Sequence, residues 1–581
     1  MKHFKSKNDF LKLLATFTFI MLPWLFALLY NVYYKKDNSQ AKIIVQNYTT
    51  DTISGADHSK FPELQKDFKS PQEVTEACLS CHNNRGEEFM HTEHFQWLKK
   101  DSIPGRGIFE MGKKNILNNF CIGVNSNEQL CSMCHAGYGY GNKDFDFTNQ
   151  KNEDCLVCHD NTGTYKKSNP CKGPNLPGAG NPSPKVNLSA VAQHVGFPKR
   201  NNCISCHGVG GGGNNVKHGD LEMVLNKCTR DIDVHMASAD TSKDVKDNNM
   251  SCQECHKTSG HNIKGSLAMV SSSPKNGASC TDCHSEKPHT DKLLNSHFRQ
   301  VACQTCHIPT YAKVNPTKIY WDWSSAGKIK NGKPLHYEKE INANDTICTS
   351  GDYILAKDLP NLKSRDNFDN VKLEYDAKHG TAVLANNLKP EYIWSNGYYN
   401  HQFISDKIND TIHPLSLNKP FGSYADNLNP SDPNHPSKII PVKIMRGKQI
   451  YDKGNMNLIQ PKLAGKIKGT GSYWVDFDWQ ASATEGMKYL NLPYSGKYSF
   501  TETESIWPIN HMVSPKEKSL SCTECHSHNS RLAGLTDFYL PGRDRSKIVD
   551  DGGIILIILA FIAILIHTTI RILSKKKIKH S

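Results

Sequence analysis

The chain is 581 residues long, 37% of it is hydrophobic, and it contains 20 Cys and 27 His. Part of the hydrophobic content lies in two apolar end segments, so the middle of the chain is poor in core-forming residues and needs cohesion from a bound metal or cofactor. The formal net charge of +13 owes much to lysines that flank these end segments. No nucleic-acid-binding motif accompanies the charge, so we predict no nucleic-acid partner.

The first apolar segment runs from Phe10 to Tyr34 behind a short basic head, which is typical of an export signal. A cleaved signal peptide ends in small residues, whereas the end of this segment is bulky, so the pattern favours a retained anchor. We expect an N-terminal membrane anchor or signal over residues 1–36 and a polar tether over residues 37–76.

The second apolar segment, Gly552 to Leu573, has no polar face apart from His567 and Arg571 near its end. It is long enough to cross ~30 Å of hydrocarbon as a helix. We therefore expect a transmembrane helix over residues 551–574 and a basic cytoplasmic tail over residues 575–581. Both ends of the chain then lie at the cytoplasmic membrane, and the region between them lies on the exported, periplasmic side.

The pattern Cys-x-x-Cys-His occurs eight times, first as Cys78-Leu79-Ser80-Cys81-His82. Two thiols on one helical turn bond covalently to a haem while the next imidazole binds the iron, so the pattern predicts eight haem c groups. Zinc is disfavoured, because it does not require a histidine after each second cysteine. In chain order the attachment pairs are Cys78 and Cys81, Cys131 and Cys134, Cys155 and Cys158, Cys203 and Cys206, Cys252 and Cys255, Cys280 and Cys283, Cys303 and Cys306, and Cys522 and Cys525. The proximal iron ligands are His82, His135, His159, His207, His256, His284, His307 and His526.

Histidines outside the motifs are the candidates for the second axial position of each iron. More of them remain than the irons require, so counting alone cannot identify an open haem. Closeness to a motif favours His261, His289, His297 and His511, and the alternative for each is an ordinary surface or hydrogen-bonding histidine.

Seven motifs lie within residues 77–307, which predicts haems packed closely enough for electrons to move between neighbours. Residues 308–521 hold no motif and are rich in Trp, Tyr, Asn, Pro and Gly, so we expect irregular structure that packs over the haems as a scaffold or as a channel wall. Residues 522–550 hold the eighth motif and a linker. The expected fold is mainly α with much irregular structure, built around packed haems, with two terminal transmembrane helices.

Four sequence blocks resemble the octahaem tetrathionate reductase family of periplasmic cytochromes. They are NFCIGVNSNEQLCSMCH from Asn119, CLVCHDNTGTYKK from Cys155, NCISCHGVGGGGNNVKHGDLE from Asn202 and DVHM from Asp233. With the matching number of motifs, the resemblance covers about residues 75 to 530. The two membrane segments fall outside it and are a departure from a soluble family.

The resemblance implies one catalytic haem, held by the second motif, with His135 as its proximal ligand and Lys217 as its distal ligand. It also implies that Cys121 is a free cysteine beside the active site. Asn214 departs from the family pattern, which has an aspartate there, and an amide cannot relay protons as a carboxylate can. The other seven haems would take their distal ligands from His94, His218, His235, His261, His289, His297 and His511.

Taken without the resemblance, Lys217 is more typical of a solvated surface lysine, although the adjacent glycine run lets the backbone approach a flat cofactor closely. Cys121, Cys171, Cys228 and Cys348 lie outside the motifs. Two interpretations stay open for them. They form disulfides in the exported compartment, or a thiol beside the haem attacks a sulfur–sulfur bond.

These features predict a reductase of tetrathionate, with nitrite and hydroxylamine as further substrates and oxidation of hydroxylamine or hydrazine as a second enzymatic option. Electrons from a membrane quinol or a periplasmic cytochrome would pass through seven bis-histidine haems to the catalytic haem. There Lys166, Lys167 and Lys217 would attract a small oxyanion. The alternative from another class is a non-catalytic conduit between the quinone pool and periplasmic carriers. The sequence does not indicate an oligomeric state.

Overall fold

The structure is a computed structural model that describes residues 55–120, 123–168, 180–237, 249–266, 268–269, 271–348, 353–363, 365, 367–409, 413–432, 434, 436–544 and 546–577. The chain divides into two compact units, Met1–Ser519 and Leu520–Ser581. The predicted N-terminal anchor, Cys121 and Cys171 lie outside the described residues.

Short helices carry the motifs of the first unit. In α2 (Pro71–Cys81) the Ser70 side chain caps the first turn by accepting a hydrogen bond from the Glu73 backbone N–H, and the first motif begins in the last turn. The other α-helices are α3 (Arg85–Met90), α4 (Glu93–Gln96), α5 (Glu128–Cys131), α6 (Cys155–His159), α7 (Leu188–Gln193), α8 (Arg200–His207), α9 (Cys252–Cys255), α10 (Lys292–Ser296), α11 (Cys303–His307), α12 (Tyr473–Asp476) and α13 (Trp479–Tyr489). The 3₁₀ turns are η1 (His58–Lys60), η2 (Pro62–Leu64), η3 (Ser132–Cys134), η4 (Gln150–Asn152), η5 (Met223–Asn226), η6 (Cys280–Asp282), η7 (His297–Arg299), η8 (Trp323–Ser325), η9 (Ala356–Asp358), η10 (Pro360–Leu362), η11 (Ala425–Asn427) and η12 (Lys516–Lys518).

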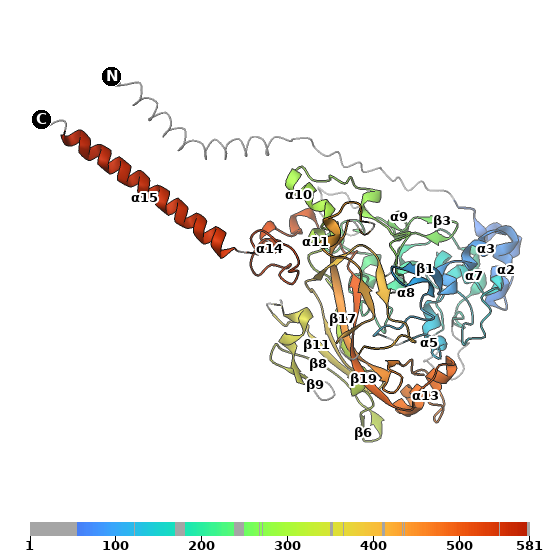
Figure 1. Cartoon of the computed structure of the whole chain (residues 1–581). Coiled ribbons are helices and arrows are strands. Elements are labelled where there is room, and N and C mark those ends of the chain that lie inside the picture. The colour runs from blue at the N-terminus through green and yellow to red at the C-terminus, as the bar shows by residue number, and fades with distance from the viewer. Residues whose placement is uncertain are drawn as a thin grey trace. The chain divides into compact units, whose positions relative to one another are not determined.

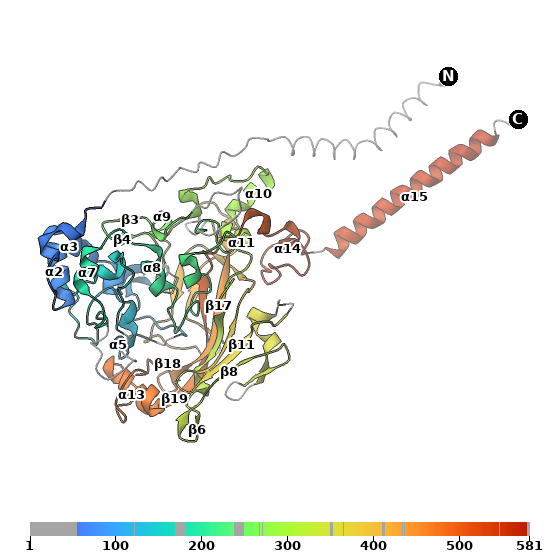
Figure 2. The same ribbon diagram turned by 180° about the vertical axis from the view of Figure 1, so that it is seen from behind.

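A nine-stranded sheet fills the long segment that has no motif. Its strand order is β15-β19-β17-β5-β12-β11-β8, and β13 and β18 also pair with β17. The strands are β5 (Thr317–Asp322), β8 (His336–Glu340), β11 (Lys372–Asp376), β12 (Gly380–Ala385), β13 (Glu391–Ser395), β15 (Leu415–Ser416), β17 (Lys438–Asp452), β18 (Asn457–Leu458) and β19 (Tyr498–Pro508). In Figures 1 and 2 the long strand β17 lies between the helices α2, α7 and α8, of which α2 and α8 carry motifs, and the strands β8 and β11.

Five two-stranded antiparallel sheets complete the described strands. They are β1 (Lys99–Ile103) with β2 (Gly107–Met111), β3 (Thr258–Ser259) with β4 (Asn262–Ile263), β6 (Ile329–Lys330) with β7 (Lys333–Pro334), β9 (Thr346–Cys348) with β10 (Tyr353–Leu355), and β14 (Tyr399–His401) with β16 (Asn418–Pro420).

Strands β17 and β19 are the two longest strands of the sheet. They pair antiparallel from Val442 opposite Pro508 to Asp452 opposite Tyr498. Most of β17 is buried on both faces, because the sheet packs on the motif-bearing segments on one side and on its own helices and loops on the other. The largest core cluster gathers Trp321, Trp323, Trp479 and Trp507, so the tryptophans of this segment build a core.

The expectation of a mainly α fold is not confirmed. The haem motifs do lie on short helices, but residues 308–521 form a sheet, and their β-branched and aromatic residues alternate in burial as in β11 and β13. The predicted tether also fails from His58 onward, since η1, η2 and α2 bury Leu64 and Val74.

The second unit contains α14 (Cys522–Cys525) and α15 (Lys547–Lys577). Within α15, Ile548–Ser574 is long and apolar enough to cross a membrane, and none of it is buried by protein. An unburied run of isoleucine and leucine is stable in hydrocarbon, not in water. The predicted C-terminal span is therefore a candidate membrane helix, whereas the predicted N-terminal span lies outside the described residues.

Candidate haem sites and active site

Six motif histidines each face one histidine from outside the motifs, with ring centres 6.0 to 6.4 Å apart. Two imidazoles on opposite sides of one iron have ring centres roughly 6 Å apart, because each metal–nitrogen bond is ~2 Å long and each ring centre lies ~1 Å beyond. The spacing therefore fits one iron between each pair. From the first motif onward the pairs are His82 and His58, His159 and His261, His207 and His94, His256 and His511, His284 and His235, and His307 and His289.

In several pairs, the ring nitrogen that would not bind the iron, Nδ1, is hydrogen-bonded to the protein. His159 Nδ1 and His256 Nδ1 hydrogen-bond to the backbone carbonyls of Gly196 and Lys264, at 2.8 and 2.7 Å. His511 Nδ1 lies 3.0 Å from the carboxylate of Asp220. Such bonds fix the tautomer and leave Nε2 to bind the metal. Burial also lowers the pKa of His207 to about 3, which keeps that ring in the neutral, metal-binding form.

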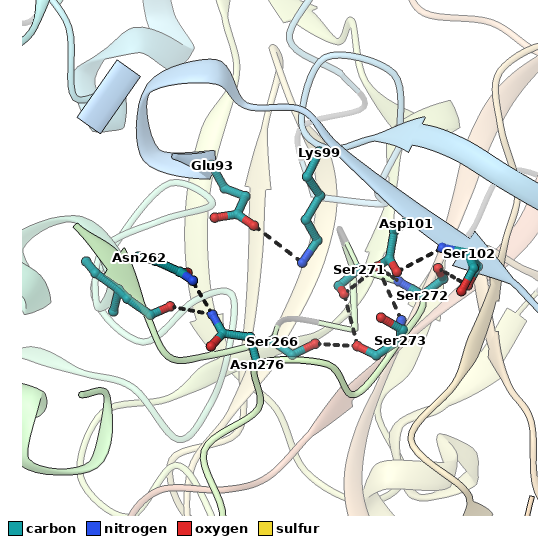
Figure 3. Close-up of polar contacts among 11 residues, drawn as sticks. Glu93, Lys99, Asp101, Ser102, Asn262, Ser266, Ser271, Ser272, Ser273 and Asn276 are labelled. Carbon is teal, nitrogen blue, oxygen red and sulfur yellow. Dashed lines mark hydrogen bonds and ion pairs between the residues drawn. The ribbon is translucent and has the colours of Figure 1, made fainter. Parts of the chain in front are cut away.

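Polar contacts hold together the segments that carry His94 and His261 (Figure 3). The Asp101 carboxylate of β1 accepts hydrogen bonds from the Ser271 hydroxyl at 2.8 Å and the Ser272 backbone N–H at 2.9 Å. Next to His94, Glu93 lies 3.6 Å from the Lys99 ammonium. Next to His261, the Asn262 side chain accepts a hydrogen bond from Asn276 at 2.9 Å. Separate polar contacts thus hold the residues next to His94 and next to His261.

The structure changes the expected set of distal ligands. Sequence reasoning assigned His58 to the tether, but in the structure it faces His82. Its position ahead of the first motif was the signal that could have identified it as a candidate ligand. His218 instead has its ring centre 4.9 Å from that of Trp507. His297 lies on η7, and its role as a distal ligand stays a prediction.

Thiols of neighbouring motifs lie within hydrogen-bonding distance of one another. Cys203 of the fourth motif meets Cys252 of the fifth, and Cys206 of the fourth meets Cys134 of the second. Cys78 of the first motif and Cys155 of the third form such a pair, and so do Cys280 of the sixth motif and Cys303 of the seventh. Electrostatic contacts of Cys158 with Cys203, and of Cys255 with Cys283, connect the remaining neighbours. The seven motifs of the first unit therefore form a continuous series from which the second motif branches at the fourth.

The histidine of the second motif has a different setting. His135 is 0% exposed and is enclosed by aromatic rings, with Trp97 and Tyr140 closest at 4.9 and 5.0 Å between ring centres. Its Nε2 hydrogen-bonds to the Phe95 carbonyl at 2.5 Å, and its buried Nδ1 has no hydrogen-bond partner among the described residues. Iron ligation through Nε2 here therefore requires the ring to turn away from Phe95.

Lysines converge on the second motif. Lys113 Nζ lies 4.9 Å from the centre of the Trp97 ring and Lys114 Nζ lies 3.1 Å from that of the Phe147 ring, and both rings pack around His135. Burial lowers the pKa of Lys114 to about 8. The surroundings of this motif are therefore electropositive, a setting that attracts anions.

Lys167 does not have the role that sequence reasoning gave it. Its side chain is 4% exposed, and its Nζ lies 2.9 Å from the Asp154 carboxylate and 3.0 Å from the Gly137 carbonyl. A buried ion pair of this kind holds the backbone next to His135 in place. Lys166 is exposed on the surface.

Lys217 follows a glycine run that lies against it. Gly211 has φ of +81°, and a Cβ there would lie 3.1 Å from Lys217 Cβ and 3.2 Å from the Phe120 ring, so only glycine fits without displacement. The Lys217 amine lies 5.1 Å from the centre of the Trp507 ring. Asn214 Oδ1 accepts a hydrogen bond from the Met223 backbone N–H at 2.8 Å. This bond joins the two ends of the loop that carries Lys217.

The chain is similar to known multihaem cytochromes. Residues 318–529 match the family described as "Cytochrome c bacterial", and residues 237–308 match "Cytochrome c7 and related cytochrome c". The structure is similar to that described as "Crystal structure of octaheme cytochrome c from Shewanella oneidensis", with a TM-score of 0.66, 38% identity, and coverage of 82% of this chain and 96% of that chain. The chain belongs to the octahaem cytochrome c family. An uncharacterized protein of Archaeoglobus fulgidus is 22% identical over 249 residues, 35% of this chain and 79% of that protein.

Membership of this octahaem cytochrome family confirms the resemblance found in the sequence blocks, and it makes haem c the cofactor and electron transfer the general activity. The number of eight haems rests on the eight motifs. Of the cysteines outside the motifs, Cys228 is a buried free thiol whose pKa burial raises to about 11, and Cys348 lies on β9.

Proposed function

We propose that this octahaem cytochrome is a membrane-anchored reductase whose active site is the haem of the second motif. His135 and Lys217 would hold that haem, which would supply electrons to a small anion that takes the place of Lys217. The observation that supports this most is the contrast at that motif: six other motif histidines face a histidine, whereas His135 is enclosed by aromatic rings against which Lys113 and Lys114 pack.

Tetrathionate is the substrate that we propose. Two electrons split its central sulfur–sulfur bond and give two thiosulfate ions, with no proton consumed. The haem supplies the electrons. Lys113 and Lys114 attract the dianion, and the aromatic wall around His135 excludes water, which strengthens these charge interactions. Cys121, which lies outside the described residues, is placed by sequence next to Phe120 and is the candidate thiol beside the site.

The remaining motifs carry electrons to this site. We propose that a membrane quinol or a small periplasmic cytochrome reduces the series, and that electrons reach the second motif through the fourth, because Cys134 and Cys206 are in contact. We propose that the candidate membrane helix in α15 anchors the protein at the membrane of the electron donor, with the haem region in the periplasm. Nitrite and hydroxylamine are smaller substrates that the same site would accept.

A conduit without catalysis is the second candidate function, and the unbroken series of neighbouring motifs favours it. Turnover of tetrathionate by the purified full-length protein with a reduced dye as donor separates the two functions. We expect turnover in the wild type, a loss of at least ~100-fold in Lys217→Ala, and wild-type turnover in the control Lys227→Ala, which changes an exposed lysine nearby. Absence of turnover with tetrathionate, nitrite and hydroxylamine would leave the conduit.

A further inference from the structure

Two residues of the large sheet lie directly beneath the loop that carries Lys217. Lys443 on β17 and Trp507 on β19 are cross-strand partners. Both are almost fully buried, at 0% and 1% exposure. They come from the part of the chain that holds no haem motif, and both contact residues 216–218.

Lys443 holds the backbone of this loop. Its Nζ lies 2.8 Å from the Lys217 carbonyl, 3.1 Å from the Val216 carbonyl and 2.5 Å from the Thr317 hydroxyl. A lysine ammonium has three donors, so these three acceptors use all of them. A buried amine and buried carbonyls are costly when unpaired, so the bonds fix the direction of the backbone at Lys217.

Close packing leaves this loop little freedom to move. Gly219 has φ of +87°, and a Cβ there would lie 2.8 Å from the Tyr311 ring and 3.3 Å from Lys443 Cδ. The stem of Lys443 therefore supports the turn that follows His218. Lys443 Nζ also lies 5.2 Å from the centre of the Phe120 ring, next to the segment that leads to the second motif.

Trp507 holds the side chains that emerge from the same loop. Its ring centre lies 5.1 Å from Lys217 Nζ and 4.9 Å from the centre of the His218 ring. Phe120 packs edge-on against Trp507, with ring centres 5.6 Å apart. The indole thus lies between Lys217 and the Phe120 segment, and an amine near an indole face is stabilised by the ring.

We propose that Lys443 and Trp507 are positioning residues for Lys217: Lys443 fixes its backbone, and Trp507 directs its side chain toward the second motif. The inference rests on the proposed role of Lys217 as a haem ligand. It also gives the sheet a function, since its two longest strands would set the geometry of the active site.

The test uses the full-length protein with its haems, and compares the wild type with variants by electron paramagnetic resonance and near-infrared magnetic circular dichroism. Lys443→Met removes the donors and keeps the length of the side chain. Trp507→Phe keeps an aromatic side chain but replaces the indole with a smaller ring. The controls are Lys448→Met, a buried lysine on the opposite face of β17, and Trp479→Phe, a buried tryptophan on α13 that stacks on Tyr473.

We expect Lys443→Met to lower the ratio of lysine-ligated to open haem at the second motif about tenfold, and Trp507→Phe to lower it about 2- to 5-fold. The bis-histidine signals stay unchanged in both, and both controls keep the wild-type ratio. The Lys443→Arg variant restores part of the ratio, because it returns donors to the carbonyls.

A wild-type ratio in both Lys443→Met and Trp507→Phe overturns the inference. If Lys443→Met yields no protein with haem, Trp507→Phe decides by the same criterion. A wild type without any signal sensitive to Lys217→Ala overturns the proposed ligand role and this inference together, whereas a signal that is lost in Lys217→Ala but kept in Lys443→Met and Trp507→Phe contradicts only the positioning.

Discussion

The second motif and the six paired motifs each provide an iron site, but the residues around the second motif differ from those around the others. At the paired motifs two imidazoles stand about 6 Å apart, and at two of these sites ring nitrogens are bonded to a carbonyl or a carboxylate. At the second motif the histidine is enclosed by aromatic rings and the nearby charges are lysines. Two fixed ligands suit electron transfer without bond changes, whereas a lysine that can leave provides a coordination site for a substrate.

Removal of the second haem has the largest expected effect. In a Cys131→Ala, Cys134→Ala double variant we expect one haem fewer by mass and a loss of tetrathionate turnover of more than ~1000-fold, while dye-driven reduction of the other haems continues. The matched control, Cys78→Ala with Cys81→Ala, removes a haem at the end of the series. Retained turnover in the second-motif variant would show that the substrate reacts elsewhere.

The next largest expected effect distinguishes the role of His58 from that of His218. Because His58 faces His82, we expect His58→Ala to convert one low-spin haem into a high-spin haem that binds carbon monoxide when reduced. His218→Ala should leave the number of bis-histidine haems unchanged, since His218 packs on Trp507. The reverse result in the two variants would restore the distal ligand set that the family resemblance implied.

A smaller effect concerns the charge around the second motif. Burial lowers the pKa of Lys114 to about 8, so its positive charge is lost as pH rises through that value. We expect KM for tetrathionate to rise about 2- to 5-fold between pH 7 and pH 9, and this rise to be absent in Lys114→Met. The folded pKa lies below the unfolded one, so this lysine makes the free energy of unfolding increase, not decrease, over the same pH interval. A KM that is equally pH-dependent in Lys114→Met contradicts the assignment.

The sequence predicted the motifs and the family, because covalent haem attachment demands a fixed spacing of residues. Five of the six histidines that face a motif histidine are among those named by the family resemblance, and their role as iron ligands stays a prediction. It did not predict His58, since a histidine in a polar stretch without a nearby periodic pattern resembles a tether. The sheet was also missed: its strands pair residues as distant as Lys443 and Trp507, and only the fold brings them beneath Lys217. Cofactor attachment is a local property of the chain, whereas the surroundings of the active site are not.

The axial ligand of the second haem is the central claim, and near-infrared magnetic circular dichroism of the oxidised full-length protein measures it directly. The account predicts bis-histidine bands accompanied by one histidine–lysine band, which disappears in Lys217→Ala and remains in Lys227→Ala. A spectrum of bis-histidine bands alone, unchanged by Lys217→Ala, would contradict it.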